Sequence, residues 1–140
     1  MNKILSYIFL AGMAIFAISC AEPADPTPTN MSYGDWRVDE YYVNNQSAAE
    51  YTGTYIGFSR FKLERDKSFV LEDENGFVYV GTWTAGDNLT LTADDGTVFD
   101  FEIVFQNFNR MQLLQTIENP SAGSLSIRYL LNNVGLDTDY

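Results

Sequence analysis

The sequence contains no histidine and only one cysteine, which narrows the chemistry open to it. Without histidine, the usual Ser-His-Asp and Cys-His catalytic sets, histidine-ligated zinc and the commonest general base are all excluded. An internal disulfide is excluded as well, because it needs a second cysteine. Carboxylates are the only abundant groups left that could perform acid–base catalysis.

The carboxylates stand mostly where exposed acids are expected. Residues 72–74 and 94–95 flank predicted turns, and Glu40 is the only acid whose position in a predicted strand suggests burial. The stretch "EDENG" places oxygen ligands beside a glycine but lacks the spacing of an EF-hand loop. A weak surface calcium site and a plain acidic turn both fit that stretch, and the plain turn is the simpler interpretation. We therefore expect no enzyme, no cofactor and no metal site.

Basic residues are also scarce. The chain has 8 basic and 19 acidic side chains, and a formal net charge of −11. Arg60, Lys62, Arg65 and Lys67 form the only basic cluster, and they alternate with apolar and acidic residues, as on a solvated strand face. Because a nucleic-acid surface needs a basic stripe, we expect no nucleic-acid partner.

The single cysteine, Cys20, follows an apolar run that begins at Ile4, directly after the basic Lys3. The run is too short to span a bilayer comfortably and has the layout of a secretory signal. The stretch Ala17-Ile18-Ser19-Cys20 resembles the lipobox of bacterial lipoproteins. That resemblance implies a signal peptide over residues 1–19, a lipid on Cys20, and an anchor in the cell envelope, at the outer membrane. A plain secretory signal with an incidental cysteine is the alternative.

Residues 20–32 are expected to form a disordered tether after the lipid. Ala21 to Met31 holds three of the four prolines and almost no large side chain, so it favours an extended spacer. Glu22 and Asp25 resemble the acidic residues that follow the cysteine in surface-exported lipoproteins. The tether could therefore hold the domain on the periplasmic face or on the cell surface.

Residues 33–140 are expected to form one all-β domain. Asn75-Gly76 and Asp95-Gly96 favour tight hairpins, and the segments around them alternate apolar and polar residues. We predict eight strands, over residues 34–43, 52–63, 67–73, 76–84, 88–93, 97–106, 110–118 and 124–132. A parity change near Ser59 predicts a bulge or a broken strand, and residues 44–50 could form a turn of helix. Consecutive antiparallel strands of this kind favour a small up-and-down β-barrel.

The early Gly34-Asp35-Trp36, followed by "GTWTAGDNLTLTADDGT", resembles the small lipocalin-like lipoproteins of bacteria. The resemblance implies that Trp36 closes one barrel end beneath an arginine of the last strand, which would be Arg128. We expect an interior lined by large aromatic side chains: Phe69, Phe77, Tyr79, Phe99, Phe101 and Phe105. An eight-stranded barrel is just wide enough to be filled by such side chains or to hold one small ligand.

Two functions are compatible with these residues. The first is a lipid-anchored protein that binds a small apolar or amphipathic ligand, with six candidate binding residues: Trp36, Tyr42, Tyr55, Tyr79, Phe99 and Phe101. The second is a solid barrel that contacts an envelope protein or a glycan through its acidic surface and the tyrosines at positions 41, 42, 51 and 55. The two functions differ in whether the barrel has a cavity.

Overall fold

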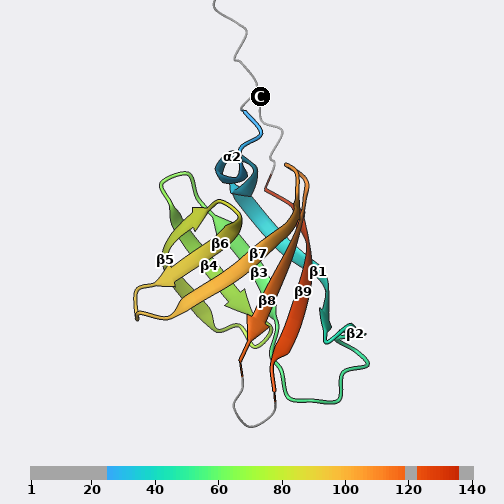
Figure 1. The fold of residues 1–140 in the computed structure, drawn as a ribbon. Helices are drawn as coiled ribbons and strands as arrows, with labels where there is room; N and C mark the ends of the chain where they lie inside the picture. Colours follow the sequence, from blue (N-terminus) through green and yellow to red (C-terminus); the bar gives the residue numbers. More distant parts are fainter. Residues whose placement is uncertain (1–24, 119–122, 136–140) are drawn as a thin grey trace, which may run out of the picture.

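The computed structural model describes residues 25–118 and 123–135, so the predicted signal peptide and Cys20 lie outside the described residues. The described chain forms a helix and nine strands (Figure 1). The elements are α2 (Pro28–Ser32), β1 (Gly34–Val43), β2 (Gln46–Ser47), β3 (Phe58–Leu63), β4 (Ser68–Asp73), β5 (Val78–Ala85), β6 (Asn88–Ala93), β7 (Val98–Gln106), β8 (Arg110–Ile117) and β9 (Leu125–Asn133). Within these residues, no helix is both long enough and apolar enough to cross a membrane.

The strands form a closed antiparallel barrel. β1 and β3 to β9 follow one another around it, each paired with the next along the chain, and β9 pairs with β1 to close the ring. Only β2 lies outside, paired with the end of β1. The predicted all-β barrel of about eight strands is confirmed, and closure leaves no exposed edge among the eight.

Tight hairpins form at both dipeptides that predicted them, Asn75-Gly76 and Asp95-Gly96. Gly76 and Gly96 have φ angles of +81° and +90° in the β4–β5 and β6–β7 turns, a conformation that favours glycine. The turn between β5 and β6 lies at Gly86-Asp87, within the predicted 84–88 segment. Local turn chemistry therefore sets the order of the central strands.

Side chains fill the middle of the barrel. Twelve large ones have less than 2 % of their surface exposed: Trp36, Phe61, Leu63, Phe69, Leu71, Trp83, Leu89, Leu91, Phe101, Leu113, Ile127 and Tyr129. Both tryptophans satisfy their indole N–H on a backbone carbonyl, Trp36 on Ser32 at 2.8 Å and Trp83 on Glu64 at 3.0 Å. The core thus buries their rings without leaving the N–H groups unsatisfied.

Three β-bulges interrupt the register of the barrel. The bulge between Phe58 and Arg60 confirms the parity change predicted near Ser59. A second bulge lies in β1 between Val38 and Glu40, so Glu40 is exposed rather than buried. It accepts a hydrogen bond from the Tyr42 hydroxyl at 2.6 Å. The sequence-based suggestion that Glu40 lies inside is therefore wrong.

The third bulge, in β7 between Ile103 and Phe105, reverses the faces of the last residues of that strand. Phe105 was predicted to point inward but is 51 % exposed, and Gln106 instead hydrogen-bonds the buried Ser32. Phe77 is also exposed rather than inside the barrel, because it lies in the turn before β5. Phe69, Phe101, Tyr79 and Phe99 do face the interior, the first two fully buried and the last two partly buried against the core.

Helix α2 differs from the extended spacer expected up to Met31. Thr27 caps it by accepting a hydrogen bond from the Asn30 N–H at 3.2 Å, and Pro28 stands in its first turn, a favoured position for proline. The helix lies across one end of the barrel (Figure 1), where Gln106 bonds both the Ser32 hydroxyl at 2.6 Å and the Pro28 carbonyl at 3.2 Å. We call this end the tether end.

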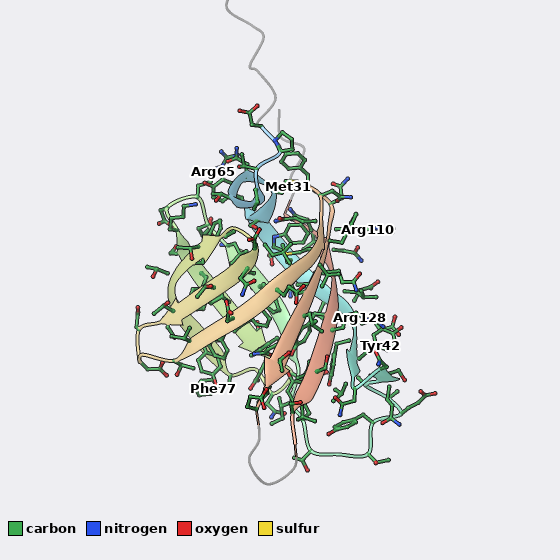
Figure 2. All side chains as sticks on the ribbon, in the orientation of Figure 1. Met31, Tyr42, Arg65, Phe77, Arg110 and Arg128 are labelled. Atoms are coloured by element: carbon green, nitrogen blue, oxygen red, sulfur yellow. The ribbon has the colours of Figure 1, made fainter. Side chains whose placement is uncertain are left out.

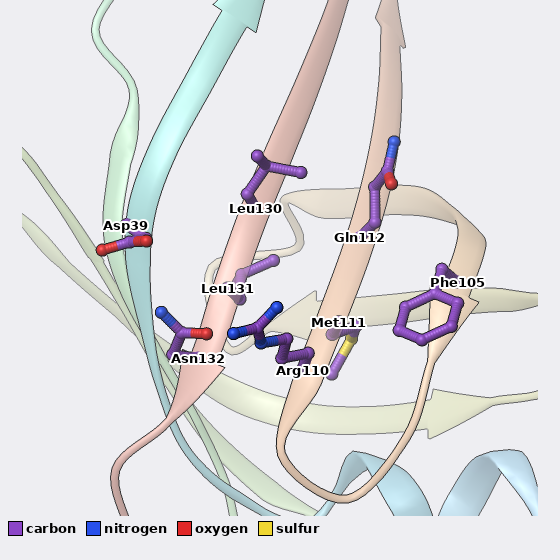
Figure 3. A pocket seen from close by; sticks show the side chains of 8 residues that line it. All are labelled: Asp39, Phe105, Arg110, Met111, Gln112, Leu130, Leu131 and Asn132. Carbon is purple, nitrogen blue, oxygen red and sulfur yellow. The ribbon is translucent and has the colours of Figure 1, made fainter.

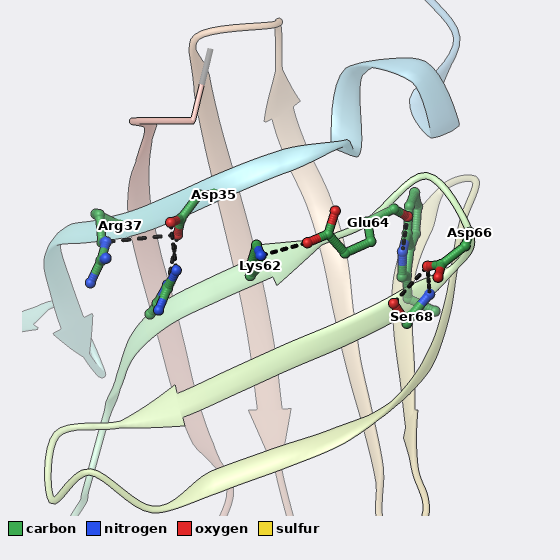
Figure 4. Close-up of polar contacts among 8 residues, drawn as sticks. Asp35, Arg37, Lys62, Glu64, Asp66 and Ser68 are labelled. Atoms are coloured by element: carbon green, nitrogen blue, oxygen red, sulfur yellow. Dashed lines mark hydrogen bonds and ion pairs between the residues drawn. The ribbon is translucent and has the colours of Figure 1, made fainter. Parts of the chain in front are cut away.

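Ion pairs gather near the tether end (Figure 4). Asp35 accepts two hydrogen bonds from Arg60, at 2.8 and 2.7 Å, and lies 3.7 Å from Arg37. The hydrogen bonds from Arg60 hold the pKa of Asp35 below its usual value. The Lys67 ammonium lies 4.2 Å from the centroid of the Trp83 ring, a cation–π contact. The basic cluster, predicted as a solvated strand face, thus also makes ion pairs and a cation–π contact within the fold.

Residues 44–57 depart most from the prediction. Positions 44–47 form a tight hairpin that contains β2, with Asn44 and Asn45 at positive φ angles. The turn of helix predicted in this region is limited to residues 47–51, where the Tyr51 N–H donates to the Ser47 carbonyl at 3.0 Å. Residues 51–57 contain no strand, so β3 begins at Phe58 and not at residue 52. The loop joins β1 to β3 at the end of the barrel opposite α2.

Candidate functional site

The end of the barrel away from α2, which we call the mouth, is covered by the loop of residues 44–57. This loop leaves β1 at Val43 and returns to the barrel at Phe58. The β4–β5 and β6–β7 turns lie at the same end (Figure 1). The mouth therefore has two tight turns and one long loop, and the long loop is the connection that covers the core.

Tyr55 fastens this loop to the interior. Its hydroxyl contacts the hydroxyl of Tyr129, a fully buried residue of β9, and lies 3.5 Å from the Gln115 side-chain oxygen on β8. The Tyr55 ring is partly buried against the core and lies 6.0 Å from the Tyr41 ring. One side chain thus joins the loop to both β8 and β9.

Glu74 ties the loop to the β4–β5 turn. Its carboxylate accepts a hydrogen bond from the Tyr41 hydroxyl at 2.9 Å and a second from the backbone N–H of Gly57 at 3.1 Å. A side chain at position 57 would place its Cβ 2.6 Å from the Tyr41 ring, so the close approach of the loop requires glycine. The loop is therefore held by two anchoring points, at Tyr55 and at Glu74.

These contacts change the acidity of the tyrosines. Burial raises the pKa of Tyr41 to about 12, and the hydrogen bond to Glu74 adds to that rise. Burial also raises the pKa of Tyr55 to about 12, although its contact with Tyr129 opposes the shift. Burial raises the pKa of Tyr129 still further. All three phenols are therefore neutral at physiological pH and can donate hydrogen bonds.

An aromatic cluster lies beneath the loop. Phe58 packs edge-on against Phe99 at 5.4 Å between ring centroids, and Phe99 packs against Tyr79 at 4.9 Å. Tyr79 in turn contacts the exposed Phe77 at the rim, 4.8 Å away (Figure 2). Aromatic side chains therefore continue from the filled core to the surface.

A hollow of about 320 Å³, which we call the mouth hollow, lies between the loop and the barrel. Its walls come from β1, the β2 hairpin, β3 and the β4–β5 turn: Val38, Asp39, Glu40, Tyr41, Ser47, Ala48, Ala49, Phe58, Ser59 and Glu74. Two rings and several small residues make up its apolar part, and the lining includes three carboxylates but no basic side chain. Nowhere in residues 25–118 and 123–135 are three acidic or cysteine side chains grouped as metal ligands.

The six predicted binding residues lie in three different places. Trp36 and Phe101 are fully buried in the core, and Tyr42 lies on the outer face. Tyr55, Tyr79 and Phe99 lie together at the mouth, linked through Phe58 and Tyr41. None of the six lines the hollow itself. Tyr55 and Phe99 each pack against one of its two rings, and the Tyr42 hydroxyl bonds its Glu40 from the outer face.

The lipocalin resemblance implied that Arg128 covers Trp36, but the structure places Arg128 elsewhere. It pairs with Tyr42 across β1 and β9, and its guanidinium lies 4.9 Å from the centroid of the Tyr42 ring (Figure 2). Its neighbours Ile127 and Tyr129 point inward, so strand alternation turns Arg128 outward. Trp36 is covered by α2 instead, through its bond to Ser32.

Sequence reasoning did not identify Phe58, Glu74, Gln115 and Tyr129 as residues of the mouth. Tyr129 carried one available signal, since a hydroxyl on the apolar face of a strand needs a partner inside the fold. Gln115 gave a similar signal, as a polar residue on the same face of β8 as Met111 and Leu113. Glu74 gave none, because it stands among other acids in a turn.

No protein-family model matches the chain, and no curated protein resembles it significantly. The likeness to lipocalin-like lipoproteins therefore remains a prediction from a few short motifs. The function has to be argued from the geometry of the barrel.

Proposed function

We propose that this protein is a lipid-anchored, non-enzymatic binding protein of the bacterial envelope, which holds a small amphipathic ligand in the mouth hollow. The observation that carries the proposal is the hollow itself, where a long loop meets the barrel over Tyr41 and Phe58. Its volume lies at the small end of the range for ligand pockets. The lipobox resemblance at Cys20 supports the anchor.

The lining also restricts the ligand. Asp39, Glu40 and Glu74 would repel an anion such as a fatty acid, and the aromatic rings favour a flat or cationic group. The filled core leaves no room near Trp36 and Phe101 for a long acyl chain. The ligand is therefore a compact molecule with an apolar part and a neutral or cationic polar part.

A matched set of three indoles tests this function. The mature chain, extracted from membranes in detergent, would be titrated with tryptamine, tryptophol and indole-3-acetate and followed by NMR. We expect shifts at the mouth with tryptamine, weaker shifts with tryptophol, and none with the acetate. Failure of all three to shift the amides around Tyr41 and Phe58 would overturn the proposal.

Two variants make the test specific. Glu74→Gln removes one charge of the hollow and should weaken tryptamine binding about tenfold, the loss expected for one charge-assisted contact. Asp94→Asn removes a charge from the neighbouring β6–β7 turn, outside the hollow, and should leave binding unchanged. Equal effects of both variants would mean that general electrostatic attraction, and not the hollow, holds the ligand.

A second function, a solid barrel that contacts another envelope molecule, is favoured by the packing of the interior. The core side chains near Trp36 are fully buried. Apolar side chains such as Val78, Val80 and Val98 are exposed on the outer face of β5 and β7. Absence of indole binding by a folded chain would make this the better function.

A further inference from the structure

A second hollow, of about 310 Å³, lies on the outside of the barrel over β8 and β9 (Figure 3). Its polar wall consists of Asp39 from β1, Asn132 from β9, and Arg110 and Gln112 from β8. Leu130 and Phe105 supply apolar surface. We call it the outer hollow.

Two β-bulges shape the outer hollow. Along β1, Val38 pairs with Leu131 and Glu40 with Leu130, which leaves Asp39 as the extra residue. Along β7, Ile103 pairs with Leu113 and Phe105 with Gln112, which leaves Val104 as the extra residue. Bulges change the direction of the side chains beside them. The strands on both sides of the β8–β9 pair thus turn a side chain, Asp39 or Phe105, onto the same outer face.

The polar groups of the outer hollow differ in hydrogen-bonding capacity. The Asp39 carboxylate only accepts, the Arg110 guanidinium only donates, and the two amides do both. In Figure 3 the Asn132 amide lies between Asp39 and Arg110. Among the described residues, none of these four side chains makes a hydrogen bond or ion pair with another residue. Within residues 25–118 and 123–135, the hydrogen-bonding capacity of these four side chains is therefore unused.

The apolar groups favour a flat partner. The Phe105 ring is 51 % exposed at the β7 side of the hollow, although a regular strand would have turned it inward. Three strand spacings of about 4.8 Å separate β1 from β7, so the distance from Asp39 to Phe105 is roughly 14 Å. An elongated molecule with one face for the ring and polar groups on its edges fits this layout.

We propose that the outer hollow binds a neutral saccharide of one or two rings. Sugar hydroxyls donate and accept at once, so they can use a carboxylate, a guanidinium and two amides together, and the C–H face of a sugar ring can stack on Phe105. Arg110 would repel a simple cation and Asp39 would repel a simple anion, so a ligand that carries a single charge is disfavoured. The outer hollow shares Asp39 with the mouth hollow but none of its other lining residues, so variants at Phe105, Asn132 and Glu74 distinguish the two sites.

NMR titration of the full mature chain tests this assignment. The probes are maltose, cellobiose and N,N′-diacetylchitobiose, with phenylalanine as a zwitterion that could pair with Asp39 and Arg110. At least one saccharide should shift the amides of β8 and β9 around Gln112 and Asn132. Binding of phenylalanine alone, or no shift with any saccharide, would overturn the assignment.

Side-chain variants then identify the contacts. Phe105→Ala and Asn132→Ala should each weaken saccharide binding about tenfold, while Phe77→Ala, which removes an equally exposed ring at the mouth, should have no effect. Glu74→Gln should also leave saccharide binding intact, which separates this test from that of the mouth. If Phe77→Ala weakened binding as much as Phe105→Ala, the outer hollow would not be the site.

Discussion

The two ends of the barrel are closed by different chemistry. At the tether end, α2 contributes backbone carbonyls and a buried serine to Trp36 and Gln106. At the mouth, the covering loop depends on phenol groups and on the single carboxylate of Glu74. The contacts of α2 join the core directly, whereas the covering loop contains no strand over residues 51–57, so we expect the loop to open at a lower free energy than the core. The core between the two ends is filled, so we expect the mouth to be the more adaptable end.

The largest effect is expected at the tether end. Trp36→Ala should lower the free energy of unfolding by about 3–5 kcal/mol, because it leaves a cavity and an unsatisfied Ser32 carbonyl. Urea denaturation followed by circular dichroism would measure the loss. Tyr55→Ala at the mouth should cost less than half as much, and Phe77→Ala less than about 0.5 kcal/mol. An equal cost at Trp36 and Tyr55 would contradict the difference between the ends.

An intermediate effect is expected from the ion pair beside the tether end. Asp35→Asn should destabilise the protein at neutral pH by about 1–2 kcal/mol, because Asp35 accepts two hydrogen bonds from Arg60. The folded-state pKa of Asp35 is lowered, so this stabilisation is present above the ordinary aspartate pKa and lost as pH falls through the lowered value. Denaturation curves from neutral to strongly acidic pH should converge for the two proteins. The matched Asp94→Asn variant should follow the wild type throughout.

A smaller effect than that of Asp35 should appear at the mouth in alkali. The pKa values of Tyr41 and Tyr55 are raised to about 12, so their stabilisation is complete below the ordinary tyrosine pKa and is lost as pH rises from about 10 towards 12. We expect ultraviolet titration to show late-ionising tyrosines and limited proteolysis to cut within residues 51–57 over that interval. Tyr55→Phe should remove one late ionisation and cost about 1 kcal/mol. Cleavage at the tether end over the same pH interval would show that the tether end, and not the mouth, opens first.

The strands and hairpins were predictable because their signals are local. Asn75-Gly76 and Asp95-Gly96 specify turns by backbone conformation alone, and the alternation around them specifies strands. The signal for the helix start at Thr27-Pro28 was equally local, since a threonine cap followed by a proline in the first turn is typical of a helix N-terminus. The neighbouring prolines favoured an extended chain instead, so the helix was not predicted.

The bulges and the mouth were not predictable in the same way. The apolar alternation through Phe99, Phe101, Ile103 and Phe105 continues without a break, although the structure inserts an extra residue at Val104. Residues 51–57 look like a strand because they contain aromatic residues, yet their partners are Tyr129 and Glu74, which lie far away in the sequence. Contacts of that kind depend on the closed barrel, and no short segment encodes them.

Helix α2 also determines how the barrel can face a surface. Eight residue steps separate Cys20 from Pro28, a span of at most about 28 Å even when fully extended. A lipid on Cys20 would therefore keep the tether end of the barrel within about 28 Å of the membrane surface. The mouth lies at the opposite end of the barrel from this attachment point, so the membrane would not need to be near it.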